Sequence, residues 1–310
     1  MAHSLVGDVG GTWARLAVMD ATGGIRARQQ VPVTEFGDPA RECAAFLAET
    51  GHRVDAVALA GAGPRVAGRI TLTNAAVTID PEAIRDAIGA SRALLLNDLE
   101  AAAWGLDADR IPDGKSKTSK PNHAVLISLG TGLGVAQRVF DPPAVLQGEA
   151  GHARLYPETE DDETLFKTLR ARHPELAVGD GLAIEAEAVL CGAGLARLFA
   201  ALGNGPDKTP ATIAALSRQG DPTAREALHR CSALLGGFAG DLALLAGDRG
   251  CIVLTGGFLD ATPEILGPAF RRTLASGGRF FAYRAACPIR HLRDPDLGLR
   301  GAWRALIMHA

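Results

Sequence analysis

The chain has 310 residues, which is long for one compact unit and ordinary for two lobes of roughly 100–200 residues each. Hydrophobic residues make up 47% of the sequence and charged residues 22%, as in a globular protein with a sizeable core. The net charge of -3 and the aromatic content of 5% argue against a nucleic-acid-binding protein, which needs a basic surface and stacking side chains.

The cysteines and the apolar segments indicate the compartment. The five cysteines form no C-x-x-C pair, so we expect neither a disulfide framework nor a structural zinc site, and we expect a reducing environment. No basic leader or cleavage signal precedes the first strand pattern. The apolar stretch 231–247 contains Asp241 and is short for a membrane span; its glycines predict a buried helix close against a sheet. We expect a soluble, cytoplasmic protein.

Two segments share the order strand, glycine turn, strand. Residues 5–20 read LVGDVGGTWARLAVMD, and residues 123–140 read HAVLISLGTGLGVAQRVF. No helix start signal follows the glycines, so the dinucleotide-binding fingerprint is excluded and hairpins are predicted. One such unit in each half favours a duplicated architecture, although two unrelated hairpins are an alternative because glycine is common in hairpin turns.

The remaining elements follow from hydrophobic periodicity and from turn residues. Strands are predicted at 54–60, 67–74, 93–96 and 251–255. Helices are predicted at 81–88, 98–106, 161–172, 184–202, 210–218, 222–246 and 299–308. The polar stretch 107–122 is the candidate link between lobes. The last helix places Trp303, Leu306 and Ile307 on one face, and we expect it to pack on the first lobe.

The first glycine turn can bind an anion. Its consecutive glycines let backbone N–H groups converge without Cβ interference, and Thr12 adds a hydroxyl donor. Phosphate would repel Asp8 unless a cation lay between them, which suggests contact with a water of Mg²⁺. A tight hairpin with an exposed acid explains these residues equally well.

The second glycine turn, Gly130-Thr131-Gly132, is a weak signal alone and informative beside the first. Two such turns could hold a nucleoside triphosphate from two sides. A P-loop is excluded because the only Gly-Lys-Ser, at 114–116, has Asp109 where the leading glycine is required. Phosphoryl transfer would therefore proceed without a Walker lysine.

Several polar residues could bind or activate hydroxyl groups. Asp98 follows an apolar strand, where it could cap a helix or accept a proton from a hydroxyl nucleophile, with Asn97 orienting the substrate. Glu149 and His152, between glycines, could bind vicinal hydroxyls, although a structural hydrogen bond is the commoner role of a lone histidine. Taken alone, Glu187 is interpreted as a solvated acid on a predicted helix.

Together the motifs resemble the bacterial glucokinase family, in the superfamily of sugar kinases, heat-shock chaperone ATPases and actin. Their ordered occurrence along nearly the whole chain is more specific than any one of them. They are GDVGGT-x-AR-x-A at 7–17, LTN at 72–74, ND at 97–98, GTGLGVA at 130–136, GE-x-GH at 148–152, E-x-VL-x-G-x-GL at 187–195, GG at 256–257 and D-P-x-L-G-x-x-GA at 294–302.

The resemblance implies a fold, a reaction and a site. The fold is the two-lobed α/β actin-like ATPase (ribonuclease H-like) fold with a cleft between a small lobe, residues 1–106 plus 292–310, and a large lobe, residues 107–291. The reaction is ATP- and Mg²⁺-dependent phosphorylation of glucose to glucose 6-phosphate, with a homodimer as the implied assembly. The implied sugar ligands are Asn97, Asp98, Glu149, His152 and Glu187, with Asp98 as the base on the 6-hydroxyl. The implied nucleotide contacts are Gly7, Asp8, Val9, Gly10, Gly11, Thr12, Gly130, Thr131 and Gly132, with Gly256 and Gly257 on the adenosine side.

Three residues depart from the family pattern. Trp13 replaces a smaller polar residue, Val77 stands where an aromatic is usual, and Ala150 replaces a glycine of the sugar loop. Because they bear on sugar preference, a kinase for another hexose or amino sugar is the alternative. A sugar-responsive regulator would carry a helix-turn-helix extension, and the first strand begins within a few residues. A non-catalytic binding protein is disfavoured by the presence of Asp98.

Overall fold

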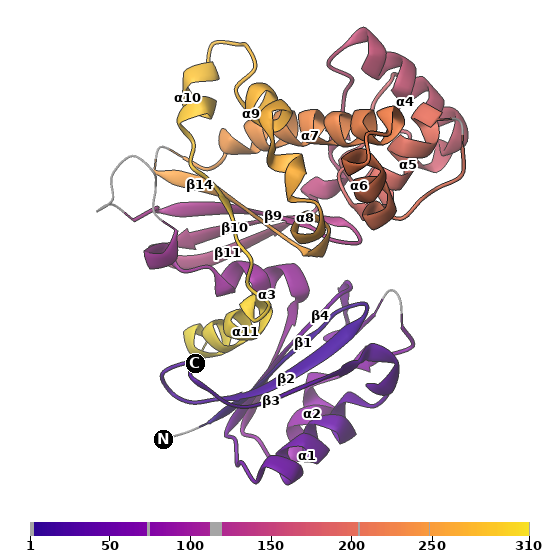
Figure 1. Ribbon diagram of the computed structural model, residues 1–310. Coiled ribbons are helices and arrows are strands. Elements are labelled where there is room, and N and C mark those ends of the chain that lie inside the picture. The colour runs from indigo at the N-terminus through magenta and orange to yellow at the C-terminus, as the bar shows by residue number, and fades with distance from the viewer. Residues whose placement is uncertain (1–2, 73–74, 112–119, 204, 248, 310) are drawn as a thin grey trace. The chain divides into compact units, whose positions relative to one another are not determined.

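The computed structural model describes residues 3–72, 75–111, 120–203, 205–247 and 249–309. The chain forms two compact units (Figure 1). The first comprises Met1–Arg110, Asp141–Gln147 and Asp294–Ala310, and the second comprises Ile111–Phe140 and Gly148–Arg293. The motif residues Thr73 and Asn74, and residues 112–119 of the predicted link, lie outside the described residues. The lobe boundaries and the cleft expected from the sequence stay predictions.

The first unit is built on a mixed five-stranded sheet with the strand order β3-β2-β1-β4-β8. Its strands are β1 (Ser4–Val9), β2 (Trp13–Met19), β3 (Ile25–Pro32), β4 (Ala56–Gly61) and β8 (Arg92–Asn97). β1 and β2 form the predicted antiparallel hairpin, which is confirmed, whereas β1, β4 and β8 run parallel. This sheet positions two of the predicted motifs.

A small three-stranded sheet corrects one strand prediction. It consists of β5 (Arg65–Val66), β6 (Arg69–Thr71) and β7 (Thr78–Ile79). The strand predicted at 67–74 is shorter at its start because Ala67 and Gly68 both have positive φ, 50° and 78°, and form the turn between β5 and β6. A left-handed backbone ends a strand, and the alternation of residue types did not reveal it.

Helices cover both faces of the first sheet (Figure 1). α1 (Pro39–Thr50) and α2 (Pro81–Ile88) share a core with one face; each begins with an aspartate N-cap before proline and ends at a left-handed glycine. α3 (Asp98–Gly105) and α11 (Leu297–Met308) share a core with the other face. Along β1, Leu5 packs in the first core and Val6 in the second, as the two-residue period of a strand requires. Short 3₁₀ turns lie at Val33–Glu35 (η1) and Ala108–Arg110 (η2).

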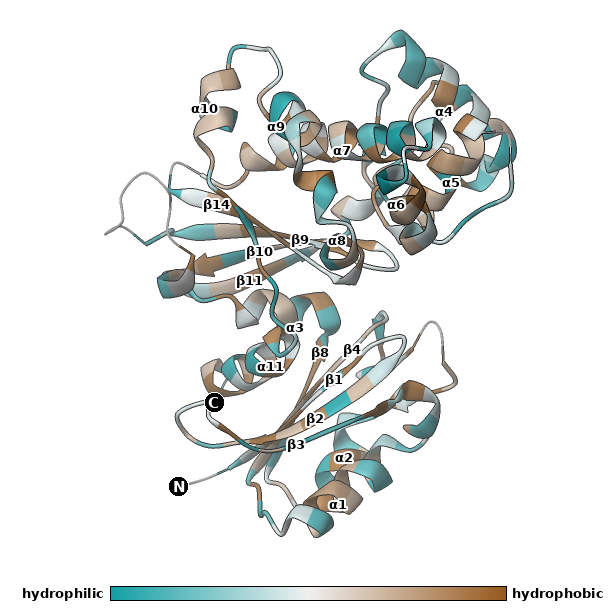
Figure 2. Cartoon of the chain, in the orientation of Figure 1, coloured by the Kyte–Doolittle hydropathy of each residue, from teal (hydrophilic) through white to brown (hydrophobic). Residues whose placement is uncertain are grey.

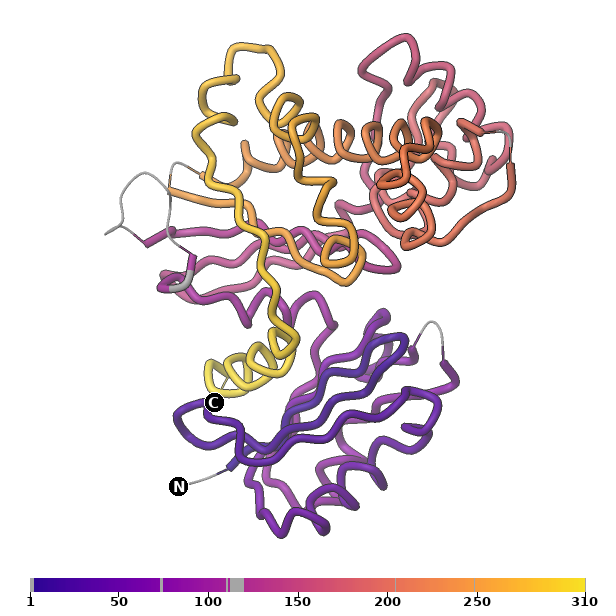
Figure 3. Tube along the Cα trace, in the orientation of Figure 1, coloured from indigo at the N-terminus to yellow at the C-terminus, as the bar shows by residue number. Residues whose placement is uncertain are grey.

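The C-terminal helix returns to the N-terminal strands, as predicted. Figure 3 shows it, in yellow, beside the indigo strands of the first unit. Of the predicted apolar face, Leu306 is buried, Trp303 is partly buried against the core, and only Ile307 is wrong, because it is 43% exposed. Leu299, Ala302 and Ala305 complete the buried face. Gly301 meets α3 so closely that a Cβ there would collide with the carbonyl oxygen of Ala101, so small residues decide which face is buried.

The second unit is also built on a sheet, with the order β10-β9-β14-β15. These strands are β9 (His123–Leu129), β10 (Leu133–Phe140), β14 (Gly250–Thr255) and β15 (Ile289–His291). The predicted second hairpin, β9 with β10, is confirmed, and β14 runs parallel to both β9 and β15. β11 (Pro143–Gly148) follows β10 along the chain, and β12 (Arg154–Leu155) pairs with β13 (Ile184–Glu185).

One large core lies between this sheet and its helices. Figure 2 shows stretches of hydrophobic residues, in brown, along both the strands and the helices. The α-helices are α4 (Glu160–Arg172), α5 (Gly192–Gly203), α6 (Pro210–Arg218), α7 (Pro222–Ala243), α8 (Gly257–Ala261), α9 (Pro268–Leu274) and α10 (Phe281–Ala286). The 3₁₀ turns are η3 (Ala150–His152), η4 (Pro174–Leu176), η5 (Ala186–Ala188) and η6 (Pro263–Leu266). Within the described residues, no helix has the length and apolar character that crossing a bilayer requires.

Two helix predictions need correction. α7 is buried as predicted, but Gly236 and Gly240 face α9 rather than the sheet, because a Cβ on either would collide with an α9 carbonyl oxygen. Gly237 instead faces the carboxylate of Glu158. The helix predicted at 184–202 begins only at Gly192. Before it the chain forms β13 and η5, because Ile184 pairs with Leu155 and the amide of Ala186 donates to the carbonyl oxygen of Ala153. Glu187 therefore lies in a 3₁₀ turn and not on the helix.

The contact of α11 with α3 yields the first testable prediction. We expect Gly301→Ala to lower the free energy of unfolding by at least about 2 kcal/mol, because the new methyl group meets backbone that cannot give way. Urea denaturation followed by circular dichroism measures this change. Gly37→Ala, at a position with open space around it, is the matched control and should stay within about 0.5 kcal/mol of the parent protein. Equal stability of both variants would contradict the packing described.

Candidate functional site

The carboxyl ends of three parallel strands bring two predicted motifs together in the first unit. The register aligns Val9 of β1 with Gly61 of β4, and Gly61 with Asn97 of β8. The first glycine turn leaves β1 at this edge, and Asp98 follows β8 at the same edge. Sheets of this kind bind ligands beyond the carboxyl ends of their strands.

The first glycine turn is an open hairpin tip. The amide of Gly10 donates to the carbonyl oxygen of Trp13 at 3.0 Å, while Gly11 and Thr12 are exposed. Gly7 lies earlier, inside β1, where a Cβ would press on Leu16 and Leu59 at 3.0–3.1 Å. Packing thus explains why a glycine is needed at position 7. The backbone amides that can face a ligand are those of the exposed tip, Gly11 and Thr12.

Asp8 is half-buried and points at a cation within its own hairpin. The guanidinium of Arg15, directly opposite in the register, donates to Asp8 Oδ2 at 3.2 Å. Burial raises the pKa of the Asp8 carboxyl, and the positive charge of Arg15 partly offsets that effect. Arg15 was quoted in the sequence motif without a role, and the pairing of residues across a hairpin is the signal that links it to Asp8.

Asn97, and not Asp98, caps α3. Asn97 Oδ1 accepts from the amide of Leu99 at 2.9 Å, and Glu100 Oε2 accepts from the Asn97 amide at 3.4 Å, which completes a capping box. Asn97 Nδ2 also donates to the carbonyl oxygen of Gly63 at 3.1 Å. The amide of Leu99 donates to Asp98 Oδ1 as well, also at 2.9 Å, so Asn97 and Asp98 share this amide at the first turn of α3.

The carboxyl group of Asp98 has a raised pKa. Burial raises the pKa of its carboxyl to about 6, the negative charge of Asp8 adds to the rise, and the hydrogen bond from the amide of Leu99 opposes it. A carboxylate with this pKa is ionised at neutral pH and has a higher proton affinity than an ordinary aspartate. Both properties suit a general base.

The second glycine turn lies at the tip of the β9–β10 hairpin in the second unit. It is held from inside by the Gly130 amide, which donates to the carbonyl oxygen of Gly132 at 3.0 Å. It is held from outside by the Gly192 amide, which donates to the carbonyl oxygen of Gly130 at 3.1 Å. Thr131 is exposed at the tip. The turn presents a hydroxyl and backbone amides to solvent, as an anion-binding tip requires.

Glu187 lies against this turn. Its Oε2 accepts from the amide of Leu133 at 2.7 Å. A Cβ on Gly132 would come within 2.5 Å of the same oxygen, so the glycine makes room for the carboxylate. The interpretation of Glu187 as a solvated acid is wrong, because its side chain is half-buried and bonded to a segment more than fifty residues away.

The predicted sugar-loop residues gather near Glu187. His152 Nδ1 lies 3.1 Å from Glu185, and this hydrogen bond raises the pKa of His152; the negative charges of Glu187 and Glu149 raise it further. Glu149 itself is exposed at the start of η3. Glu185 was missed from the sequence, where nothing distinguishes it from other surface acids. The second unit therefore brings Glu149, His152 and Glu187 into one acidic cluster.

Gly256 and Gly257 follow β14 beside the second glycine turn. The parallel register aligns Thr255 with Ser128, so β14 and β9 end at the same edge. Gly256 has a φ of +114°, and a Cβ there would collide with the backbone of Leu129. No atom lies within 4 Å of the Cβ position of Gly257, which leaves its surface open for a ligand.

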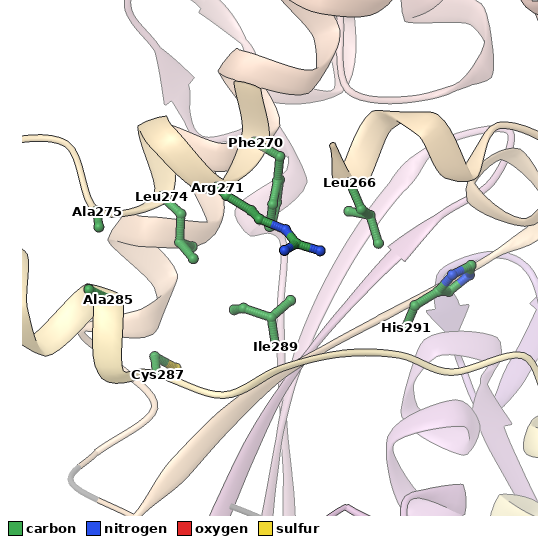
Figure 4. Close-up of a pocket in the computed structure, with 9 residues that line it drawn as sticks. All are labelled: Leu266, Phe270, Arg271, Leu274, Ala275, Ala285, Cys287, Ile289 and His291. Carbon is green, nitrogen blue, oxygen red and sulfur yellow. The ribbon is translucent and has the colours of Figure 1, made fainter. Parts of the chain in front are cut away.

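A cavity of about 390 Å³ lies elsewhere in the second unit (Figure 4). Its wall is mostly apolar, with the guanidinium of Arg271 reaching over it and His291 at one end. It contains none of the predicted site residues and no carboxylate, and its histidine, His291, is hydrogen-bonded through Nε2 to Asp260 Oδ1 at 2.8 Å. The carboxylates that could do this chemistry lie at the strand ends.

Comparison with known proteins agrees with the motifs. The family model described as glucokinase matches residues 5–309. A glucokinase of Nitrobacter hamburgensis is 34% identical over 317 residues, covering 97% of this chain and 96% of that protein. The glucokinase of Chromohalobacter salexigens is 31% identical over 98% of this chain and 97% of its own length.

Solved structures agree as well. The crystal structure of a glucokinase from an Antarctic psychrotroph has 28% sequence identity and a TM-score of 0.84, covering 99% of both chains. A ROK family glucokinase from Streptomyces griseus, in complex with glucose and AMPPNP, has 24% identity and a TM-score of 0.64, and shares the fold. The predicted two-lobed actin-like ATPase fold is thus confirmed, as is the predicted class, an ATP-dependent hexose kinase. The chain belongs to the glucokinase family.

Proposed function

We propose that this chain transfers the γ-phosphoryl group of ATP to the 6-hydroxyl of glucose, with Asp98 as the general base. The observation that carries the assignment is a half-buried Asp98 carboxyl group, with a pKa of about 6, at the same sheet edge as the first glycine turn. Asp98 accepts the hydroxyl proton as the oxygen bonds to phosphorus, the bond to the β-phosphate breaks, and ADP leaves. The five free thiols suit the cytoplasm, where this reaction would serve glycolysis.

The two hairpin tips are proposed to hold the nucleotide. Thr12 and Thr131 are exposed at the tips, each beside glycine amides, and Gly257 offers open surface for the adenosine side. Phosphoryl transfer needs little covalent chemistry from the protein, so positioning and charge stabilisation dominate. Water must be excluded from the bound substrates, because it otherwise competes with the sugar as phosphoryl acceptor.

The sugar is proposed to bind through amide, carboxylate and imidazole groups. Glu149 and His152 are exposed on one loop, and Glu187 keeps one carboxylate oxygen, Oε1, without a hydrogen-bond partner among the described residues. Asn97 uses Oδ1 and one amide hydrogen for the cap and for Gly63, which leaves its second amide hydrogen for a hydroxyl. These residues supply both donors and acceptors, as vicinal hydroxyls require.

A magnesium ion fits at Asp8 only as part of a nucleotide complex. Within the described residues, no group of three His, Cys, Asp or Glu side chains could hold a metal ion. Asp8 uses one oxygen for Arg15 and keeps the other for a metal-bound water. Mg²⁺ commonly retains several waters and binds through phosphates with one or two carboxylates, so this single acid suits it. When bound, the ion would neutralise phosphate charge.

Removal of the base tests the central assignment. We expect Asp98→Asn to lower kcat by roughly 10²- to 10⁴-fold, because the amide cannot accept the hydroxyl proton, with glucose affinity largely retained. Coupled ADP-release kinetics and calorimetric glucose binding measure the two effects. Glu100→Gln, which replaces a neighbouring acid and keeps an oxygen for the capping bond, is the control and should retain most activity. An Asp98→Asn enzyme of near-parental kcat would rule out the proposed role.

The raised pKa of Asp98 predicts how kcat/KM depends on pH. The protonated form of Asp98 cannot act as a base, so kcat/KM should fall as the pH drops below about 6. Asp8→Asn removes a negative charge that raises the pKa of Asp98, and it should move this acidic limb to lower pH. Profiles of kcat/KM between pH 4.5 and 8 would show the shift whatever the absolute rate. A limb that stays in place would exclude Asp98 as its source.

A sugar-dependent ADP-release screen tests the substrate. We expect glucose to give the highest kcat/KM among glucose, mannose, fructose and N-acetylglucosamine. Val77 is buried in the core of the first unit and Ala150 is half-buried, so neither places a new polar group at the surface. A higher value for another sugar would favour the alternative hexose or amino-sugar kinase, and ATP consumption unaffected by every sugar would contradict the kinase proposal itself.

A further inference from the structure

The acidic sugar-side cluster and the second glycine turn are physically joined in the second unit. The 2.7 Å hydrogen bond between Glu187 Oε2 and the amide of Leu133 spans the two. A hydrogen bond to a charged group is shorter and stronger than one between neutral groups, and this length is typical of it. Glu187 therefore contacts the turn directly, through an oxygen that is already bonded to the backbone.

Two further contacts surround the same turn. The sugar-loop residue Gly151 is buried so close to Leu133 that a Cβ on it would collide with the Leu133 carbonyl oxygen. On the other side, the amide of Gly192 donates to the carbonyl oxygen of Gly130 at 3.1 Å. The turn is thus held by the sugar loop, by η5 and by the start of α5. Of these three contacts, only that of Glu187 is made by a side chain, and it can be removed without altering the backbone.

We propose that Glu187 is a positioning residue for the nucleotide: its Oε2 holds the second glycine turn in the conformation that binds phosphate, independently of any sugar contact made by Oε1. This inference rests on the proposed function, which assigns the turn to the nucleotide. Glycine-rich segments have many unbound conformations, so fixing one of them in advance lowers the entropy lost on binding. The same carboxylate then links sugar recognition to nucleotide recognition.

The proposal separates a positioning role from a purely sugar-binding one. A residue that only binds sugar leaves nucleotide affinity unchanged when sugar is absent. A residue that positions the turn changes that affinity, and a substitution that keeps the acceptor oxygen rescues it. Glutamine keeps such an oxygen, whereas alanine does not. Gly132→Ala offers an independent route, because its Cβ would come within 2.5 Å of Oε2 and displace the flexible carboxylate without removing it.

The test is the affinity for Mg-ADP without sugar, measured by isothermal titration calorimetry on the full chain. We expect Glu187→Ala to weaken binding about 10-fold and Glu187→Gln to stay within about threefold of the parent. Gly132→Ala should weaken Mg-ADP binding as much as Glu187→Ala does. The double variant should bind Mg-ADP no more weakly than either single variant, because both substitutions break the same hydrogen bond. Glu185→Ala, which removes a neighbouring carboxylate that bonds His152 and not the turn, should bind Mg-ADP normally.

A second measurement reports on the contact itself. Hydrogen exchange at the Leu133 amide should be slow in the parent, in Glu187→Gln and in Glu185→Ala, and faster in Glu187→Ala. Unchanged exchange of the β9 amides would show that the variants remain folded. Parental Mg-ADP affinity in Glu187→Ala, alongside normal turnover by the parent enzyme, would overturn the positioning role and leave the proposed function standing. A parent enzyme that binds no Mg-ADP and consumes no ATP with glucose would overturn the proposed function, and this inference with it.

Discussion

The parallel pairing of β1, β4 and β8 is the constraint on which the proposed chemistry depends. It makes strands far apart in the sequence end at one edge, where the first hairpin tip and Asp98 meet. It also places the charge of Asp8 near enough to contribute to the raised pKa of Asp98. The packing of α3 against α11 supports the same edge, because α3 begins at Asp98. A stable helix pair thereby fixes the position of a reactive carboxylate.

Each unit carries a hairpin tip and an acidic residue bonded to that hairpin. A hairpin tip offers amides and a threonine hydroxyl, and a neighbouring acid is tied to that hairpin: Asp8 through Arg15 in the first unit, and Glu187 through the amide of Leu133 in the second. These two interactions differ. Asp8 forms an ion pair with a cation and keeps one oxygen for metal-bound water, whereas Glu187 accepts a hydrogen bond from a backbone amide and so stabilises the turn. From that difference we propose that the first unit supplies the catalytic base, whereas a carboxylate of the second unit links sugar recognition to nucleotide recognition.

Much of this was predictable from local sequence signals, and the exceptions have physical reasons. Helix 81–88 was predicted to the residue because Asp80-Pro81 and Gly89 mark its ends, and both hairpins followed from glycines with no helix start after them. Ile307 was misplaced because helix contact at Gly301 selects the buried face, and that contact is a tertiary one. Glu187 was misassigned to a helix for the same reason: its environment comes from Leu133 and the strand pair β12–β13, which no local pattern encodes. The family motifs named Glu187 without indicating its contact with the turn.

A crystal structure of the chain with glucose and AMPPNP bound tests the proposed role of Asp98 most directly. We expect a carboxylate oxygen of Asp98 within about 2.6–3.2 Å of the glucose 6-hydroxyl oxygen, with the triphosphate in contact with both hairpin tips. An Asp98 side chain that points away from the 6-hydroxyl, or a triphosphate bound away from both tips, would contradict this expectation.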